Sequence, residues 1–258
     1  GWIQAYAENA QESLDFALMS YYIAEHKTVS TPFMVNLDGF ILTHTYETVD
    51  VPSEKQADEY LPPYDTENRL DLDNPKNLAF SAGPEHNYIF KYKEHKAMLN
   101  AVKVISEAEE RFEKIFGRHY TGLVEKYRTD DADYIIITLG SISGLCRETA
   151  DILRNKGIKA GVLRLRYLRP FPADEISEAV RNAKAVAVLE KDISFGSEGT
   201  VFTNVNSALY SAGLSIPSYN FIGGLGGRNI SMHDITDIFD KIISGTQKVN
   251  FIGIGVNQ

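Results

Sequence analysis

The chain contains a single cysteine, Cys146, among its 258 residues, and this scarcity excludes several classes of protein. One thiol cannot form an internal disulfide framework, and it cannot supply the thiolates that an internal iron–sulfur cluster requires. The histidines show no His-x-x-x-His spacing and no Cys-x-x-Cys occurs, so no metal site is predicted. Such a chain is expected in a reducing cytoplasm.

Long apolar runs and excess positive charge are also missing. No run of about 18 apolar residues occurs, so no membrane-spanning segment is predicted. No charged and then apolar leader opens the chain, so no secretory signal is predicted. The net charge of −9 argues against binding the phosphate backbone of nucleic acids. With 43% hydrophobic and 24% charged residues, the composition is that of a globular protein with a core.

The chain has no initiator methionine and begins at Gly1-Trp2-Ile3-Gln4, in a pattern typical of the inside of a strand. At the other end, residues 249–256 are apolar almost throughout. We therefore expect a piece of a larger subunit, or a subunit that needs neighbours.

Residues 1 to about 50 predict a strand, a helix and a second strand, which is half of an α/β unit. Asn9 is a helix-capping residue type, and Glu12 stands at the capping-box position. Apolar residues then recur at helical spacing, and residues 32–37 predict the following strand. A unit of this size is too small to fold alone.

Residues 51–128 predict an extended arm and a long helix. Up to about residue 90, prolines including Pro84 interrupt regular elements among acidic residues. Large apolar residues in the same stretch predict packing on a surface, either of a partner or of the chain's own domain. From residue 91 to about 127, apolar residues spaced three and four apart predict a helix, with Gly117 as a stop signal.

Residues 129–258 predict a second domain in which strands and helices alternate. The expected strands are 134–139, 160–165, 185–189 and 219–222, and the expected helices are 145–155, 174–183, 200–212 and 231–244. Residues 168–172, Leu-Arg-Pro-Phe-Pro, predict a stiff turn. This alternation is typical of right-handed crossovers and a mainly parallel sheet, so the predicted fold class is α/β.

The segment after the strand at 32–37 is a candidate functional surface. Asp38 and Gly39 form a turn there, and Thr43 and His44 follow it. Ligands of open α/β sheets bind outside the carboxyl ends of strands, and histidine transfers protons near neutral pH. The alternative is a structural role for this histidine, with no contact to substrate.

Three other segments leave two interpretations open. Gly140–Gly144 follows a strand and either binds an anion or makes a tight turn, although its spacing fits neither a dinucleotide site nor a P-loop. The glycine-rich loop 223–227, followed by Arg228, is either a recognition loop or structural. Residues 190–192, Glu-Lys-Asp, are a surface ion-pair cluster or part of a site at a strand end.

Arginines concentrate near one predicted strand end. Arg164, Arg166 and Arg169 bring positive charge together in an acidic protein, and we expect these side chains, with Arg228, to contact a partner. Cys146 lies near a helix start, where a thiolate would be favoured, but a small buried residue is the expected role.

Several segments resemble one known family, in order over nearly the whole chain. They are residues 1–4, 7–15, 38–40 with 43–44, 60–64, 115–118, 139–141, 168–172 and 224–228. These segments resemble the α subunits of 2-oxoacid:ferredoxin oxidoreductases, and Leu-Pro-Pro-Tyr at 61–64 is similar to the linker of the pyruvate branch. The resemblance implies the end of a pyrimidine-binding domain at 1–50, a linker arm and helix at 51–128, and a domain like the carboxy-terminal domain of transketolase at 129–258.

The resemblance also implies a reaction, cofactors and partners. Thiamine diphosphate, held with Mg²⁺ between this subunit and a β subunit, serves as electron sink while pyruvate loses CO₂. The acetyl group passes to coenzyme A, and electrons pass through [4Fe–4S] clusters on partner subunits to ferredoxin; the reverse reaction is pyruvate synthesis. The expected partners are β, γ and δ subunits. No nucleic acid or membrane is expected.

The family's activating Glu and its substrate-side Thr and Arg should precede Gly1, so we expect the chain alone to be inactive. Glu8 and Asn9 are then the candidates for cofactor binding, and Asp38, Thr43 and His44 those for catalysis. Two alternatives remain: a non-catalytic assembly domain that docks partners, and a related enzyme for oxalate, 2-oxoglutarate or branched-chain oxoacids.

Overall fold

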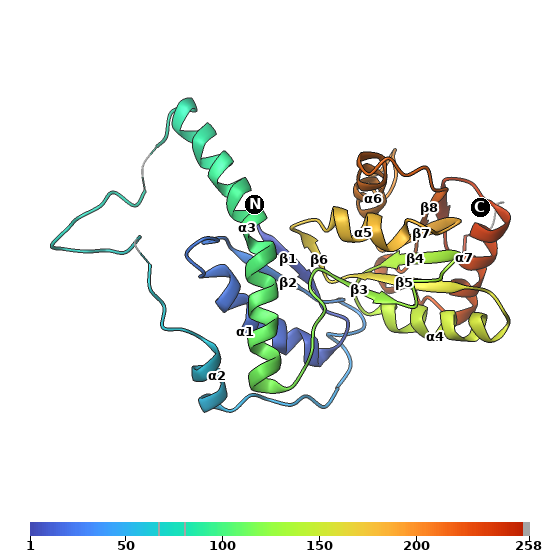
Figure 1. Ribbon diagram of the computed structural model, residues 1–258, viewed down its shortest axis with the longest axis horizontal. Coiled ribbons are helices and arrows are strands. Elements are labelled where there is room, and N and C mark those ends of the chain that lie inside the picture. The colour runs from blue at the N-terminus through green and yellow to red at the C-terminus, as the bar shows by residue number, and fades with distance from the viewer. Residues whose placement is uncertain (67, 80, 255–258) are drawn as a thin grey trace.

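The computed structural model describes residues 1–66, 68–79 and 81–254, and it forms two bodies, each built on its own sheet (Figure 1). The first body contains a three-stranded sheet in the order β2-β1-β6, and the second a six-stranded sheet in the order β3-β5-β4-β7-β8-β9. Most strand pairs of the larger sheet are parallel, which confirms the predicted α/β class.

The first body begins with the predicted strand, helix and strand. They are β1 (Ile3–Tyr6), α1 (Ala10–Ala24) and β2 (Phe33–Asn36), and β1 and β2 pair in parallel. Asn9 caps α1, because its side chain accepts a hydrogen bond from the Glu12 backbone N–H at 2.8 Å. The third strand, β6 (Tyr167–Arg169), pairs antiparallel with β1, although a stiff turn was predicted there. A segment of the predicted second domain thus completes the first sheet.

The region predicted as an arm contains a short helix and the start of a long one. Helix α2 (Glu54–Tyr60) begins with a capping box between Ser53 and Gln56 that the proline pattern obscured. Helix α3 (Pro84–Phe116) starts at Pro84, which acts as a first-turn residue and not as a breaker. The predicted stop is confirmed, because Gly117 caps α3 in the left-handed conformation.

The second body has helices on both faces of its sheet (Figure 1). Helices α4 and α7 contact each other on one face, and α5 and α6 on the other. The strands are β3 (Val124–Tyr127), β4 (Tyr134–Thr138), β5 (Ala160–Leu165), β7 (Ala185–Glu190), β8 (Ser218–Ile222) and β9 (Val249–Phe251). The helices are α4 (Ile142–Asn155), α5 (Ala173–Val180), α6 (Thr200–Ser211) and α7 (Met232–Ser244), with a short 3-10 turn, η1 (Leu225–Gly227).

The predicted strands and helices between residues 129 and 245 agree with these bounds to within three residues. Strand β3 was missed, because its residues fall inside the segment predicted as helix; it forms the antiparallel edge beside β5. The apolar C-terminal stretch contains β9, while its residues 255 and 256 lie outside the described part. Among the described residues, no helix combines the length and apolar character needed to cross a bilayer.

Candidate functional site

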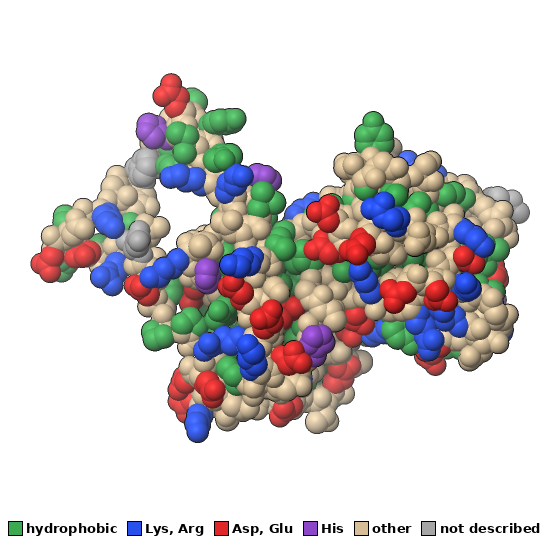
Figure 2. Space-filling model, viewed as in Figure 1, with side chains coloured by type: hydrophobic (Ala, Val, Ile, Leu, Met, Phe, Trp, Pro, Cys, Tyr) green, Lys and Arg blue, Asp and Glu red, His purple; other side chains and the backbone are tan. Residues whose placement is uncertain are grey.

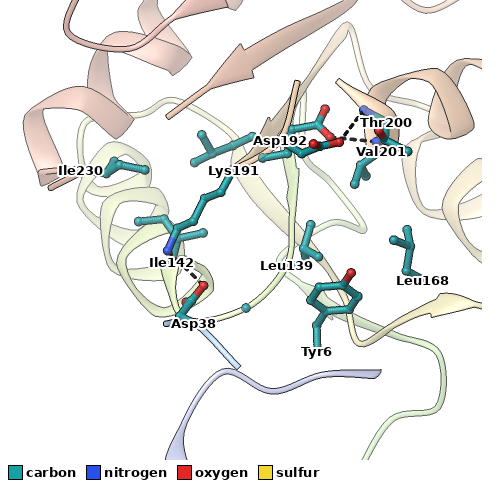
Figure 3. Close-up of a pocket in the computed structure, with 13 residues that line it drawn as sticks. Tyr6, Asp38, Leu139, Ile142, Leu168, Lys191, Asp192, Thr200, Val201 and Ile230 are labelled. Carbon is teal, nitrogen blue, oxygen red and sulfur yellow. Dashed lines mark hydrogen bonds and ion pairs between the residues drawn. The ribbon is translucent and has the colours of Figure 1, made fainter. Parts of the chain in front are cut away.

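A cavity opens at the point where the strand order of the large sheet reverses. Strand β4 is followed by α4 on one face, and its neighbour β7 is followed by α6 on the other, so the two connections diverge. Such switch points are where open α/β sheets bind ligands. The cavity has a volume of about 380 Å³ and is covered by residues of the first body, Tyr6 and Asp38 among them (Figure 3). Its lining comprises Tyr6, Asp38, Leu139, Gly140, Ile142, Leu168, Leu189, Glu190, Lys191, Asp192, Thr200, Val201 and Ile230.

Asp38 joins the first body to this cavity. Its Oδ2 accepts a hydrogen bond from the Ser141 backbone N–H at 3.0 Å and another from the Ser141 hydroxyl. Its Oδ1 pairs with Lys191 Nζ at 3.1 Å (Figure 3). The sequence left two interpretations for the turn at Gly140, an anion contact or a tight turn. The turn does bind an anion, which is the carboxylate of the chain's own Asp38.

The side chain of Glu190, the last residue of β7, lies at the start of α6. Its carboxylate accepts hydrogen bonds from Val201 N at 2.8 Å, Phe202 N at 3.1 Å and Asn220 Nδ2 at 2.8 Å. Burial raises the pKa of Glu190 above its ordinary value, and these three donors partly oppose that rise. The acid at this strand end is therefore buried in the chain, whereas a surface cluster was one of the two interpretations.

The remaining polar groups of the cavity are few. Asp192 accepts a long hydrogen bond from Thr200 N at 3.4 Å. Burial raises the pKa of the Tyr6 hydroxyl, and the nearby Asp192 carboxylate adds to that rise while Arg169 opposes it. Apart from Lys191 and Thr200, the other side chains that line the cavity are aliphatic. Because carboxylates already fill both helix starts, the cavity suits an uncharged or cationic group better than a phosphate.

A buried ionic network lies behind this cavity, at the carboxyl end of β1. Arg164 donates to Glu125 Oε2 at 3.0 Å and to Glu12, and Arg166 donates to Glu12 Oε1 at 3.0 Å and to Glu109. Both arginine side chains are almost completely buried. These side chains therefore make ion pairs inside the chain, which differs from the predicted contact with a partner.

Aromatic rings complete the surroundings of Arg166. Its guanidinium carbon lies 4.7 Å from the Tyr120 ring centre and 5.0 Å from that of Phe16. Burial alone would lower the pKa of Arg166, but the carboxylates of Glu109 and Glu12 outweigh burial and raise it. The group stays charged, and it ties α1, α3 and the segment before β6 together.

The candidates for cofactor binding are already engaged. Glu8 pairs with Arg147 at 2.7 Å and with Arg164 at 3.5 Å, while Asn9 Oδ1 accepts from the Glu12 backbone. Among the described residues, no group of acidic, histidine and cysteine side chains is arranged to hold a metal ion. Within the described residues, Glu8 and Asn9 are thus held by contacts inside the chain, and no Mg²⁺ ligand set stands ready beside them.

Thr43 and His44 lie on an exposed turn outside the lining of the cavity. The Thr43 hydroxyl donates to Gly39 O at 2.6 Å and contacts His44 Nδ1 at 3.0 Å. The His44 ring stacks on Phe40, which in turn packs over Gly227 of the glycine-rich loop. Of the candidates for catalysis, only Asp38 lines the cavity.

The other predicted residues lie apart from each other. Arg228 donates to Gly253 O at 2.7 Å, and Arg169 donates to Leu168 O at 2.6 Å and to Asn204 at 3.3 Å. Both are less buried than Arg164, so a partner contact stays a prediction for them. Cys146 is buried in the core between α4 and α7, as expected for a small apolar residue.

Sequence reasoning missed Tyr6, Lys191 and Ile230 as neighbours in one cavity. Tyr6 ends β1 and Lys191 follows β7, so their positions at strand ends were the available signal. No signal in the sequence indicated the pairing of β6 with β1, and this pairing is what brings the two sheets together at the cavity.

Two family models match the chain. "Pyruvate flavodoxin/ferredoxin oxidoreductase, thiamine diP-bdg" matches residues 1–110, and "Pyruvate:ferredoxin oxidoreductase core domain II" matches residues 132–235. Among solved structures, 2-oxoglutarate:ferredoxin oxidoreductase from Magnetococcus marinus superposes with a TM-score of 0.58 over 94% of this chain and 42% of that chain. With 18% sequence identity, this likeness concerns the fold.

Curated relatives share much more of the sequence. Pyruvate synthase subunit PorA of Methanothermobacter thermautotrophicus is 43% identical over 98% of this chain and 65% of its own length. Ketoisovalerate oxidoreductase subunit VorA of Pyrococcus abyssi is 41% identical over 94% of this chain and 61% of its own length. The chain thus spans somewhat less than two thirds of the relatives it matches. On these matches, the chain belongs to the pyruvate:ferredoxin oxidoreductase family.

Proposed function

We propose that this chain is the α-subunit portion of a pyruvate:ferredoxin oxidoreductase. The reaction is the oxidation of pyruvate with coenzyme A to acetyl-CoA and CO₂, with the electrons passed to ferredoxin, or its reversal. The observation that carries the proposal is the 43% identity to a pyruvate synthase subunit over 98% of the chain. The match of residues 1–110 to a thiamine diphosphate-binding family model supports it.

In this proposal the chain contributes part of a cofactor-binding domain and the domain fixed to it. Thiamine diphosphate, when bound with Mg²⁺ at an interface with a β subunit, supplies the electron sink for decarboxylation. The chain's own residues fix the two bodies in their relative orientation. Asp38 holds the carboxyl end of β2 against the start of α4, and Arg164 and Arg166 hold β1 and α1 against the second body. In this proposal the [4Fe–4S] clusters belong to partner subunits, and the one cysteine of this chain is buried in its core.

A branched-chain oxoacid is the second candidate substrate. Ketoisovalerate oxidoreductase subunits from Pyrococcus are 41–42% identical to this chain, against 40–43% for the pyruvate synthase subunits. The two groups are therefore equally similar here. We favour pyruvate because of the Leu-Pro-Pro-Tyr run at residues 61–64, which resembles the linker of the pyruvate branch.

The test is anaerobic dye reduction by the full-length subunit assembled with its partner subunits. Viologen reduction should depend on both coenzyme A and an oxoacid, and pyruvate should give a higher kcat/KM than ketoisovalerate or 2-oxoglutarate. The assembled complex should contain iron. A complex that reduces the dye with ketoisovalerate but not with pyruvate would select the second candidate, and one free of iron and inactive with every oxoacid would refute both.

The contribution of this chain to catalysis, as opposed to docking alone, is tested in the same complex. His44→Ala and Arg228→Ala each remove an exposed side chain that the protein core does not need. Lower turnover with intact assembly would indicate a catalytic role, whereas loss of assembly would indicate docking. We propose the cytoplasm as the location, because its reducing conditions suit the free thiol of Cys146.

A further inference from the structure

The first ten residues of α3, 84–93, are all exposed, and this end of the helix projects from the first body (Figure 1). The helix runs for 33 residues from Pro84, yet its buried residues begin only at Ala101. Isolated helices shorter than about 12–15 residues are marginal in water, and most helical stability in proteins comes from packing of an apolar face. The start of α3, residues 84–93, therefore lacks the burial that stabilises its remainder, whose contacts with the first body begin at Glu94, Met98 and Asn100.

An apolar stripe follows the projecting helix on a face turned away from the core. The stripe consists of Tyr88 (78% exposed), Tyr92 (58%), Leu99 (50%) and Val102 (38%). These residues are spaced four, seven and three apart, and His95 fills the gap of seven. This is the spacing of a two-helix packing seam. The buried residues Ala101, Val104, Ile105 and Ala108 of the same helix lie on a different face, so the stripe cannot serve the chain's own core.

Positive charge borders the stripe. Residues 84–103 contain four lysines and two glutamates, in a chain whose net charge is −9. Figure 2 shows hydrophobic side chains beside basic ones on this projecting end. One glutamate, Glu94, is already paired with Lys91 at 2.7 Å, while Lys96 lies over the Tyr92 ring and has no carboxylate partner within the described chain.

We propose that this stripe docks an amphipathic helix of another subunit, one that carries Asp and Glu beside an apolar row of its own. Tyr92 and Leu99 would pack into that row. Lys96 and Lys103, which stand seven residues apart and flank the stripe on one side, would face its acids, with Lys103 exchanging its exposed pairing to Glu107. Two copies of this chain fit less well, because each would bring the same excess of lysine to the seam. The proposal rests on the proposed function only in placing other subunits beside this chain.

The test is site-specific photo-crosslinking in the complex assembled from full-length subunits. A benzophenone amino acid replaces Tyr92, and in a matched control it replaces Tyr210 of α6, which is 86% exposed. Mass spectrometry of the Tyr92 adduct should identify an acid-rich helical segment of a different subunit, and the Tyr210 control should not capture that segment. A crosslink to the same polypeptide or to a second copy, or no crosslink, would overturn the proposal.

Charge reversal separates recognition from chance proximity. Lys96→Glu with Lys103→Glu should lower the yield of the Tyr92 crosslink about tenfold, the effect of about 1.4 kcal/mol in binding. The control Lys156→Glu changes an exposed lysine of the second body and should leave the yield unchanged. An unchanged yield in the double variant, or binding of the free full-length subunit to anionic phospholipid vesicles through the stripe, contradicts the proposal.

Dye reduction measured on the same samples keeps the two proposals apart. An inactive complex that still forms the crosslink refutes the proposed reaction and leaves the docking surface in place. An active complex without the crosslink refutes the docking surface alone.

Discussion

The Oδ2 atom of Asp38 accepts a hydrogen bond from the backbone N of Ser141 at 3.0 Å. A residue that follows β2 in the first body therefore caps α4 in the second body. Its second oxygen pairs with Lys191 at 3.1 Å. One side chain therefore links β2, α4 and the end of β7, and it does so at the rim of the cavity. The Asp-Gly turn recognised in the sequence acts here as a connection between the two bodies.

Asp38→Ala should lower the free energy of unfolding by about 1–2 kcal/mol, because it removes a helix cap together with a partly exposed ion pair. Denaturant unfolding measures this loss. In a double-mutant cycle with Lys191→Met, the coupling energy should be about 0.5–1 kcal/mol and should shrink in high salt. Strict additivity of the two substitutions would show that the ion pair contributes nothing.

Arg166→Met should destabilise the chain far more, by about 3–5 kcal/mol, because Glu12 and Glu109 would remain buried with one counter-charge removed. Urea unfolding of the variant and of the control Arg181→Met, which changes an exposed arginine, gives the comparison. Adding Glu109→Met to Arg166→Met should recover part of the loss. Equal stability of the Arg166 variant and the control would mean that the network is not a source of stability.

The alternation of strands and helices in the second body could be predicted from the sequence because each element carries its own local signal. Strands β5 and β7 are buried at every position, so they appear as mainly apolar runs, which only Arg164 in β5 and Glu190 at the end of β7 interrupt. Helix α7 begins with the Ser231–Asp234 capping box. These signals depend on neighbours within about one turn or one strand, and tertiary contacts did not override them.

The first body and the cavity could not be predicted in the same way. Strand β6 has only three residues and is followed by a proline. It is a strand because it pairs with β1, whose residues precede it by at least 162 positions in the chain. The pairing of Arg164 and Arg166 with Glu12 likewise joins residues more than 150 positions apart. A charge pattern in one segment indicated that acidic partners exist, but it did not indicate whether they belong to this chain.

Gly199→Ala tests the close approach at the start of α6. A methyl group on Gly199 would overlap the Glu190 carboxylate, so the carboxylate would have to leave the N–H groups of Val201 and Phe202. We expect a loss of about 2–3 kcal/mol in unfolding free energy. Gly39→Ala is the matched control, since nothing lies within 4 Å of its added methyl group, and it should change stability by less than about 0.5 kcal/mol.

The cause of that loss is checked by combining the substitution with Glu190→Ala. Once the carboxylate is absent, adding Gly199→Ala should cost little more, so the two effects should be far from additive. If Gly199→Ala costs as much in the Glu190→Ala background as in the native chain, the crowding arises from another group.

Cys146 should be chemically inert in the folded chain. Burial raises the pKa of its thiol to about 12, against about 8.5 in an unfolded chain, although Arg147 partly opposes the rise. At pH 8 the reactive thiolate then makes up about one part in ten thousand in the folded state and roughly a quarter in the unfolded state. Iodoacetamide should therefore label the native protein very slowly and the denatured protein within minutes, as mass spectrometry would show. Rapid labelling of the native chain at pH 8, with no change in its circular dichroism, would place the thiol at a solvent-accessible position and would contradict the packing of α4 against α7.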